Sequence, residues 1–554
     1  MLDFFSLASL LPLILVVVNP GFIQTDSTML NIYQGLGMGS QVSMGIVLTV
    51  AVLMFFVLKT WINHWITYRK ASYAYGVGSE LASAAISQYF TLPYQKFASV
   101  DFAKELHRLS NVPLMFSNNI IIPAGTLLSE FLVLVILSVA IAWYQFNVFL
   151  LLFIILVPAY FIYQRKRKQA SLISGSIALI YPRLLKYTLE IVEGLIDIRS
   201  FHKENYFKQR FEQSHQDLSK TFAREHTSQT DIARTTELVA VFCVCLILGY
   251  SLLSRQNEQD TPLLLGIYAA VSFRLIPSIN RIFAALQQMR TNSHVVDELP
   301  GLRDTEDRHA DQRSTIYKAQ TPAFLSSILL DNITFSYPNS PGILQATTLE
   351  IRKGEMIAIT GQSGKGKTTL FLVLLGLLEP DAGKVLLDGI PCDDETIGAW
   401  RKLFGYVPQQ PYLLDATIAE NVAFGMDKHD IQVEKIIRLL DQMELGAWIG
   451  TLPEGIYTRV GEKGLQISGG QRQRLAIARG LYHDCEILLL DEVTNQLDSN
   501  TEAEIFESLK KVAAGKTVMM ITHHPDLLIQ FERVYELVDG GLREITHSNL
   551  SSHP

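Results

Sequence analysis

The first half of the chain contains apolar runs that are long enough to cross a membrane. A hydrocarbon core about 30 Å thick needs about 20 mostly apolar residues per helix, and only 18% of all residues are charged. We expect about six spans, near Leu2–Ile23, Met44–Trp65, Ala124–Trp143, Phe146–Tyr163, Glu237–Leu253 and Pro262–Leu286. The second half contains no such run, so a membrane part precedes a soluble part.

The distribution of basic residues predicts which side each part occupies. Lys and Arg are absent between Gly21 and Ser43, whereas the segments Arg69–Arg108 and Arg165–Arg234 are rich in them. The positive-inside rule therefore places these two segments, both termini and the soluble half in the cytoplasm, with the spans in the inner membrane. The formal net charge of −7 gives no case for nucleic-acid binding.

The two basic segments are too long to be turns between spans. We expect each to consist of helices that continue below the membrane, joined by a short crossing helix near Leu92–Asp101 and near Glu193–Phe201. After the last span, the polar and highly charged stretch Asp297–Gln320 indicates a linker. From Ile328 onward, short β-branched runs alternate with helical patterns, which is typical of an α/β domain with a largely parallel sheet.

The predicted fold is multidomain, with an all-α six-helix membrane domain followed by an α/β domain. We expect the membrane domain at 1–296, the linker at 297–327 and the α/β domain at 328–554.

The sequence Gly361–Thr368 (GQSGKGKT) matches the phosphate-binding P-loop pattern. The apolar run Met356–Thr360 precedes it and the helical run Thr369–Leu377 follows it, as the motif requires. Lys367 would reach the β- and γ-phosphates of ATP, and Thr368 would bind Mg²⁺. The residues that we expect to contact the nucleotide here are Gly361, Gln362, Ser363, Gly364, Lys365, Gly366, Lys367, Thr368 and Thr369.

Downstream, the apolar strand in Glu486–Glu492 ends in two carboxylates, where a parallel sheet presents its ligand-binding edge. Asp491 suits Mg²⁺ and its water shell, and Glu492 suits the polarisation of attacking water. A lone acidic pair after a strand is more often a helix cap, but the upstream P-loop favours the catalytic interpretation.

Between these motifs, Ile467–Gln471 (ISGGQ) resembles the signature of ABC ATPases. The resemblance covers the whole second half. It implies that Tyr337 stacks on adenine, that Gln409 senses Mg²⁺ along with Thr368 and Asp491, and that His523 contacts the γ-phosphate. Asp498 falls in the family's D-loop. The implied catalytic residues are Glu492, His523 and Gln409.

The signature also predicts a partner. A helix start with exposed N–H groups attracts phosphate, so the resemblance implies that the signature holds ATP bound to a second copy, giving a homodimer. The signature residues concerned are Ser468, Gly469, Gly470 and Gln471. Thr458–Gly464 is similar to a segment that ABC exporters carry just before the signature. This chain departs from the family pattern at Lys365, at Asn495–Asp498 and at His524.

Cations in or near the spans bear on the cargo. Arg274 and Arg281 lie seven residues apart and hence on one helical face, while Lys59 and Arg234 lie near other span ends. Since a charge in a membrane is costly, these cations either reach the headgroups or pair with Glu130 and Glu237, or they form a basic belt for phosphate groups.

The stretch Phe273–Arg281 resembles bacterial lipid-linked oligosaccharide flippases, and Lys59 and Arg234 match basic positions of that group. The resemblance implies a polyprenyl-pyrophosphate oligosaccharide as cargo, held by Lys59, Arg234, Arg274 and Arg281. It also implies a small external helix, for which Ser27–Leu36 is the candidate, with an ordinary outer loop as the alternative. The alternatives are an ABC exporter of another lipid, a peptide or a drug and, from another class, an ATP-gated channel or regulatory subunit.

Overall fold

The computed structural model describes residues 35, 41–98, 101–144, 146–253, 277–299, 322–338, 340–393, 396–461, 467–493 and 499–546. The chain divides into two compact units. One unit comprises Met1–Phe90 and Val100–Thr305, and the other comprises Thr91–Ser99 and Glu306–Pro554. The second unit therefore includes a short segment from within the sequence of the first.

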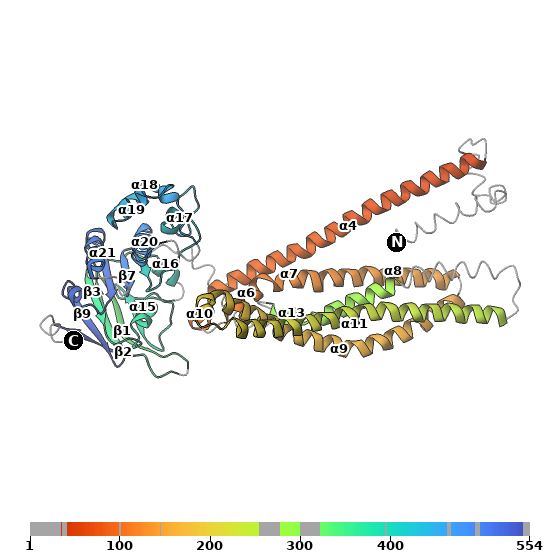
Figure 1. Ribbon diagram of the computed structural model, residues 1–554, viewed down its shortest axis with the longest axis horizontal. Coiled ribbons are helices and arrows are strands. Elements are labelled where there is room, and N and C mark those ends of the chain that lie inside the picture. Colours follow the sequence, from red (N-terminus) through yellow and green to blue (C-terminus); the bar gives the residue numbers. More distant parts are fainter. Residues whose placement is uncertain are drawn as a thin grey trace. The chain divides into compact units, whose positions relative to one another are not determined.

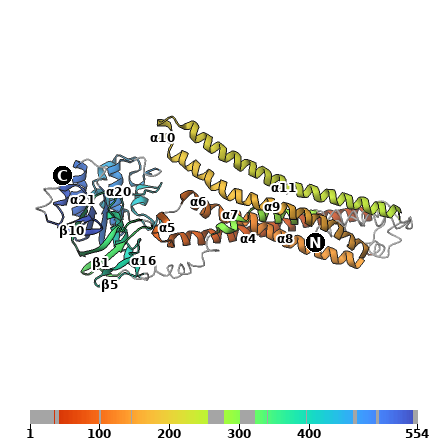
Figure 2. The ribbon, with the colours of Figure 1, turned by 90° about the horizontal axis from the view of Figure 1, so that it is seen from below.

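Long helices form the first unit (Figure 1). They are α4 (Gln41–Thr91), α8 (Ile122–Tyr144), α9 (Phe146–Glu193), α11 (Glu204–Leu253) and a helix of residues 277–291. The shorter α6 (Phe102–Ser110), α7 (Val112–Phe116) and π-helix η1 (Ser117–Ile121) lead into α8. Figure 2 shows α9 and α11 running side by side, connected by α10 (Leu195–Ser200) at one end.

The predicted spans coincide with helices wherever the structure describes them. The second to fifth spans fall in α4, α8, α9 and α11, and residues 277–286 of the sixth are helical. The first span, residues 262–276 and most of the predicted external helix Ser27–Leu36 lie outside the described residues. Short helices occur at both predicted crossing positions, as α5 (Tyr94–Ala98) and α10.

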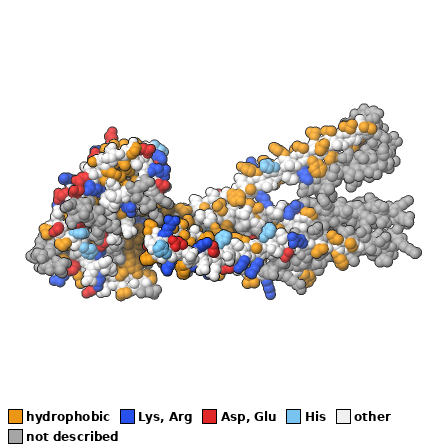
Figure 3. Space-filling view, viewed as in Figure 1, with side chains coloured by type: hydrophobic (Ala, Val, Ile, Leu, Met, Phe, Trp, Pro, Cys, Tyr) orange, Lys and Arg blue, Asp and Glu red, His pale blue; other side chains and the backbone are white. Residues whose placement is uncertain are grey.

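Two stretches of the described helices, Val42–Thr91 and Val112–Val139, are long and apolar enough to cross a membrane. Their large apolar side chains are exposed: Met54 and Val57, for example, are 70% and 71% exposed. Figure 3 shows hydrophobic side chains along α4. A soluble helix of this length would bury such a surface, so these stretches need an apolar surrounding.

The beginning of the predicted linker is structured, which the sequence did not indicate. Helix α13 (His294–Glu298) includes the first two linker residues, Asp297 and Glu298. Val295 and Leu299 are buried in a cluster with Val112. So short a helix is marginal by itself, and this burial explains why it forms despite the polar sequence around it.

Two sheets form the second unit. The six-stranded sheet has the order β10-β9-β3-β8-β7-β6, and only the β10–β9 pair is antiparallel. The four-stranded sheet, β2-β1-β4-β5, is antiparallel and was not predicted. The strands are β1 (Ser327–Phe335), β2 (Leu344–Arg352), β3 (Met356–Thr360), β4 (Ala382–Leu387), β5 (Ile390–Pro391), β6 (Phe404–Val407), β7 (Ile487–Asp491), β8 (Thr517–Ile521), β9 (Arg533–Val538) and β10 (Gly541–Ile545).

Helices surround these sheets and create two apolar cores. They are α15 (Lys367–Leu374), α16 (Ile397–Arg401), α17 (Ile418–Val422), α18 (Val433–Gln442), α19 (Gly446–Gly450), α20 (Gly469–Tyr482), α21 (Ser499–Val512) and α22 (Pro525–Leu528). One core joins α17, α18 and α20 to β7, and the other lies between the sheets around α15. Tyr94 of α5 packs against the second core, within the same unit.

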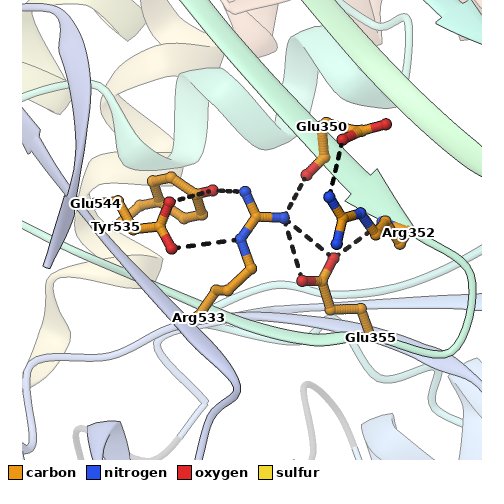
Figure 4. A network of polar contacts seen from close by, with 6 residues as sticks. All are labelled: Glu350, Arg352, Glu355, Arg533, Tyr535 and Glu544. Atoms are coloured by element: carbon orange, nitrogen blue, oxygen red, sulfur yellow. Dashed lines mark hydrogen bonds and ion pairs between the residues drawn. The ribbon is translucent and has the colours of Figure 1, made fainter. Parts of the chain in front are cut away.

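A polar network fastens the two sheets together (Figure 4). Arg533 of β9 pairs with Glu355, just before β3, at 3.1 Å, and also donates to the backbone oxygen of Glu350 in β2 at 3.1 Å. Glu355 is only 5% exposed. A buried carboxylate requires such partners, so Arg533 fixes the position of β3 and hence of the loop that follows it.

Candidate functional site

The P-loop and three other predicted site residues follow the carboxyl ends of parallel strands. The P-loop follows β3, Glu492 follows β7, His523 follows β8 and Gln409 follows β6. Since β6, β7, β8 and β3 are adjacent and parallel, these ends meet at one edge of the sheet. The topology thus brings together residues that are more than 160 positions apart in sequence.

The P-loop connects β3 directly to α15. Gly366 caps this helix with a φ of 104°, in the left-handed region. A Cβ atom at this position would lie 2.3 Å from Cγ2 of Ile343, so only glycine fits. The N-terminal end of α15 therefore stands immediately behind the loop, where its N–H groups and dipole favour an anion.

Lys367 is buried, with 4% of the residue exposed. Its Nζ donates to the backbone oxygens of Gly361 at 2.9 Å and Gln362 at 3.1 Å, and lies 3.6 Å from Oε1 of Glu492. Burial lowers the pKa of this ammonium below its ordinary value, although Glu492 and Asp491 oppose the shift. A buried cation at the base of the loop is the partner that a phosphate requires.

Asp491 and Thr368 offer oxygen atoms beside this cation. The Asp491 carboxylate accepts a hydrogen bond from the Thr368 hydroxyl. It accepts a second one from the Tyr406 hydroxyl, at 3.3 Å. Burial raises the pKa of Asp491, while these two hydrogen bonds and Lys367 oppose the shift. Hydroxyl and carboxylate oxygens are ligands of the kind that Mg²⁺ prefers, so the residues present fit this ion.

Glu492 is the point where the predicted catalytic residues meet. Its Oε2 accepts from Nε2 of Gln409 at 2.8 Å, and its Oε1 lies 3.3 Å from Nε2 of His523. Burial lowers the pKa of His523, with Lys367 adding to the effect. Glu492 has a φ of 49°, an uncommon conformation outside glycine that often marks functional positions. The sequence predicted these residues, but not that Gln409 and His523 both contact the carboxylate of Glu492.

Tyr337 lies beside the start of α15. Its ring packs edge-on against Phe335 at a centroid distance of 5.0 Å, and its hydroxyl lies 3.5 Å from Oγ1 of Thr369. The ring is half-buried. This position is compatible with the predicted contact to a nucleotide base.

The signature residues begin helix α20. Oγ of Ser468 accepts from the backbone N–H of Gln471 at 3.2 Å, and Gln471 accepts from the backbone N–H of Ser468 at 2.9 Å, a reciprocal capping box. Ser468 and Gly469 are exposed. In the part of the chain that the structure describes, no hydrogen bond or ion pair joins Ser468–Gln471 to the P-loop.

A contact that the sequence did not predict links the signature helix to Gln409. Nε2 of Gln473 in α20 donates to the backbone oxygen of Gln409 at 2.9 Å. Gln473 is buried. The sequence did offer one signal for this contact, because Gln473 lies one turn into the helix that begins at the signature motif.

Two of the departures from the family pattern have partners. Lys365 pairs with Asp539 at 3.4 Å, and His524 pairs with Glu502 at 3.2 Å. Asp498 and the rest of the altered D-loop lie outside the described residues, as do residues 462–464 of the segment before the signature.

The four predicted cargo-binding cations are not brought together by any contact among the described residues. Lys59 of α4 lies over the ring of Phe56 at 5.1 Å, and Arg234 of α11 is exposed. Arg281 pairs with Glu130 at 2.7 Å, which was one of the two alternatives for this residue. Arg274 lies outside the described residues.

Comparison with known proteins agrees with this geometry. Residues 344–495 match the family described as ABC transporter, and this stretch includes the P-loop, Gln409, the signature and both carboxylates. Residues 344–495 form an ABC transporter domain. Such a domain binds nucleotide. Its strands and helices place the P-loop and the signature as described above.

Solved structures and curated proteins extend the likeness beyond the ABC transporter domain. The chain has the fold of a bacterial Atm1-family ABC exporter solved with ATP bound, with a TM-score of 0.79 over 93% of this chain and 91% of that chain, at 20% identity. It is 32% identical to an ATP-dependent lipid A-core flippase of Ralstonia nicotianae over 57% of this chain. It is 30% identical to ABC transporter B family member 29, chloroplastic, of Arabidopsis thaliana over 69% of this chain.

The matched part of the chain spans 53% of the Ralstonia protein and 60% of the Arabidopsis protein. A lipid A-core flippase of Xylella fastidiosa matches more widely, at 27% identity over 86% of this chain and 80% of that protein.

Proposed function

We propose that this chain is half of a homodimeric ABC exporter that hydrolyses ATP to move a lipid across the cytoplasmic membrane. The observation that carries the proposal is the convergence of Gln409, His523 and Lys367 on Glu492, at the sheet edge beside Asp491. The apolar helices of the first unit and the fold of an ABC exporter support its membrane role.

The ATP site acts through positioned charges. Lys367 and the start of α15 hold the phosphates, and Tyr337 stacks on the base. Thr368, Asp491 and Gln409 would hold Mg²⁺, which would offset the negative charge that develops on the phosphates. Glu492 then accepts the proton of the attacking water, and His523, within 3.3 Å of Glu492, keeps that carboxylate in line.

The second copy completes each site. Ser468–Gln471 forms an exposed helix start that makes no hydrogen bond or ion pair with a P-loop residue among those described in this chain. A second copy related by twofold symmetry would place this helix start against the γ-phosphate bound to the first copy. ATP is then sandwiched between the two copies, and its hydrolysis separates them.

The proposed cargo is a phosphorylated glycolipid, with a polyprenyl-pyrophosphate-linked oligosaccharide as the first candidate. Lys59, Arg234 and Arg281 support an anionic headgroup, and several relatives carry the name lipid A-core flippase. An exporter of another lipid, a peptide or a drug is the alternative with the same architecture. An ATP-gated channel or regulatory subunit is disfavoured because Glu492 and His523 are both present and in contact.

The test is a protected-leaflet flipping assay on the purified chain in liposomes. One set of liposomes contains a polyprenyl-pyrophosphate oligosaccharide and the other contains lipid A. We expect ATP-dependent flipping of one of them, and its loss in Glu492→Gln. Robust ATP hydrolysis without flipping of either lipid would contradict the proposed cargo class, and ATP binding without turnover would favour a channel or regulatory subunit.

A further inference from the structure

A polar cluster connects three helices of the first unit, away from the ATP site. Lys70 of α4 donates through Nζ to Oγ1 of Thr126 in α8, at 2.6 Å. One turn further along α8, Oε1 of Glu130 lies 2.7 Å from Nε of Arg281, in the helix of residues 277–291. Lys70 also lies close enough to Glu130 for an attractive electrostatic interaction. Glu130 thus stands between two cations.

The backbone is adapted to this cluster. A Cβ atom at position 125 of α8 would lie 2.8 Å from Cε of Lys70, so Gly125 leaves the space in which the lysine stem lies. Figure 1 shows α4 diverging from α8 toward the N-terminal end of α4. Lys70 therefore connects α4 to α8 before the two helices separate.

The position of Glu130 is unusual for a carboxylate. Its side chain is 13% exposed, and among the described residues its Oε2 is buried without a hydrogen-bond partner. A half-satisfied buried carboxylate is costly, so its attraction to the two cations must keep it there. With Lys70 and Arg281 both positive, the cluster still has one positive charge in excess.

Arg281 has unused binding capacity. Its contact with Glu130 is made through Nε, and 44% of the side chain is exposed. No other ion pair of Arg281 occurs among the described residues. A guanidinium carries one positive charge, so a phosphate that binds the exposed N–H groups of Arg281 weakens the attraction between Arg281 and Glu130 and repels the carboxylate.

We propose that Glu130 is a resident counter-ion of Arg281, which the anionic headgroup of the cargo displaces on binding and which recaptures Arg281 when the cargo leaves. Lys70 holds Glu130 during the exchange, so the carboxylate is never left without a cation. The inference rests on the anionic cargo of the proposed function. Its consequence is that Glu130 sets the headgroup affinity low enough for release.

The test measures ATP hydrolysis by the full chain in phosphatidylcholine vesicles as a polyprenyl diphosphate or, in a second arm, lipid A is titrated in. Glu130→Gln removes the competing charge and keeps the shape of the side chain. We expect the half-saturating lipid concentration to fall about tenfold, which corresponds to about 1.4 kcal/mol. Maximal stimulated turnover should fall as well, because release is slower. The arm that responds identifies the headgroup.

Three variants make the result specific. Glu130→Asp keeps the charge and should restore the wild-type half-saturating concentration. Glu80→Gln applies the same substitution at an exposed position of α4 and should change nothing. In an Arg281→Gln background, Glu130→Gln should have no further effect on lipid affinity, because the competition acts through Arg281.

The outcomes separate this inference from the proposed function. Stimulated ATP hydrolysis with the same or a higher half-saturating lipid concentration in Glu130→Gln would overturn the counter-ion role alone. If neither lipid stimulates the wild type, the anionic cargo is wrong and the counter-ion role falls with it. If Glu130→Gln does not assemble, an unchanged lipid affinity in Glu130→Ala/Arg281→Gln relative to Arg281→Gln supports the inference, and a changed affinity overturns it.

Discussion

At the scale of single residues, the site works through a few carboxylates whose partners are already in place. Glu492 accepts a hydrogen bond from Gln409 at 2.8 Å and lies 3.6 Å from Lys367. These two contacts fix the position of its carboxylate beside the phosphate-binding cation. Asp491 stands beside it and depends on the hydroxyls of Thr368 and Tyr406. Small changes to these partners should therefore alter activity without disturbing the fold.

Tyr406→Phe tests the dependence of Asp491 on its hydrogen bonds. Burial already raises the pKa of Asp491, and the Tyr406 hydroxyl opposes that rise. A protonated carboxyl cannot bind Mg²⁺, so activity is lost as the pH falls through the pKa of Asp491. Without the hydroxyl this loss should begin at a higher pH, and the half-saturating Mg²⁺ concentration at neutral pH should rise about threefold.

The measurement is ATP hydrolysis against pH and against Mg²⁺ concentration. Tyr412→Phe, at an exposed tyrosine of the same unit, is the matched control. A Tyr406→Phe profile that overlays that control at low pH would show that the hydroxyl does not assist Asp491.

At the scale of secondary-structure elements, the sequence predicted the strands and helices that lie next to a motif or coincide with an apolar run. Strand β3 has the predicted bounds, Met356–Thr360, because four apolar residues and a β-branched threonine directly before a P-loop favour a buried strand. Helix α20 begins at Gly469, within the predicted signature, because the capping box of Ser468 and Gln471 fixes its first turn.

What the sequence did not predict depends on contacts between distant residues. Helix α13 forms because Val295 and Leu299 are buried against Val112, and the cluster of Lys70, Thr126 and Glu130 joins separate helices. A weak signal did exist for Lys70, because it lies eleven residues after Lys59, which is three helical turns and hence the same face of α4. The antiparallel sheet escaped prediction because bulges in β1 interrupt its alternation.

The network of Figure 4 predicts where the second unit is most sensitive. Arg533→Gln leaves the buried Glu355 without its ion pair and should lower the local unfolding free energy of β3 and β9 by about 2 kcal/mol. Amide hydrogen exchange in these strands should then be roughly thirtyfold faster.

Arg352→Gln is the control for this change, because the ion pair of Arg352 with Glu350 is exposed. It should alter exchange little, as surface ion pairs contribute about 0–1 kcal/mol. Equal exchange rates in the two variants would mean that Arg533 does not fasten β3.

At the scale of the whole molecule, the ATP site is proposed to need residues from two copies. This predicts complementation between two inactive variants, Lys367→Ala in the P-loop and Ser468→Arg in the signature. Each variant alone has no intact site. When the two are co-expressed, about half of the dimers are mixed, and each mixed dimer has one intact site. ATP hydrolysis should recover to about a quarter of the wild-type rate if the sites act independently.

The recovery requires that the variants exchange partners, which differently tagged copies and tandem purification establish. Purified mixed dimers without any ATP hydrolysis would indicate that P-loop and signature act within one chain or that one site cannot work alone.

The most direct test of the account is lipid-stimulated ATP turnover of the reconstituted chain, compared with Glu492→Gln. The account predicts that a phosphorylated lipid accelerates hydrolysis in the wild type. Glu492→Gln should bind ATP as tightly and lose at least about a hundredfold in turnover, the contribution expected of a general base. A wild type that binds ATP and hydrolyses it no faster than Glu492→Gln would contradict the account.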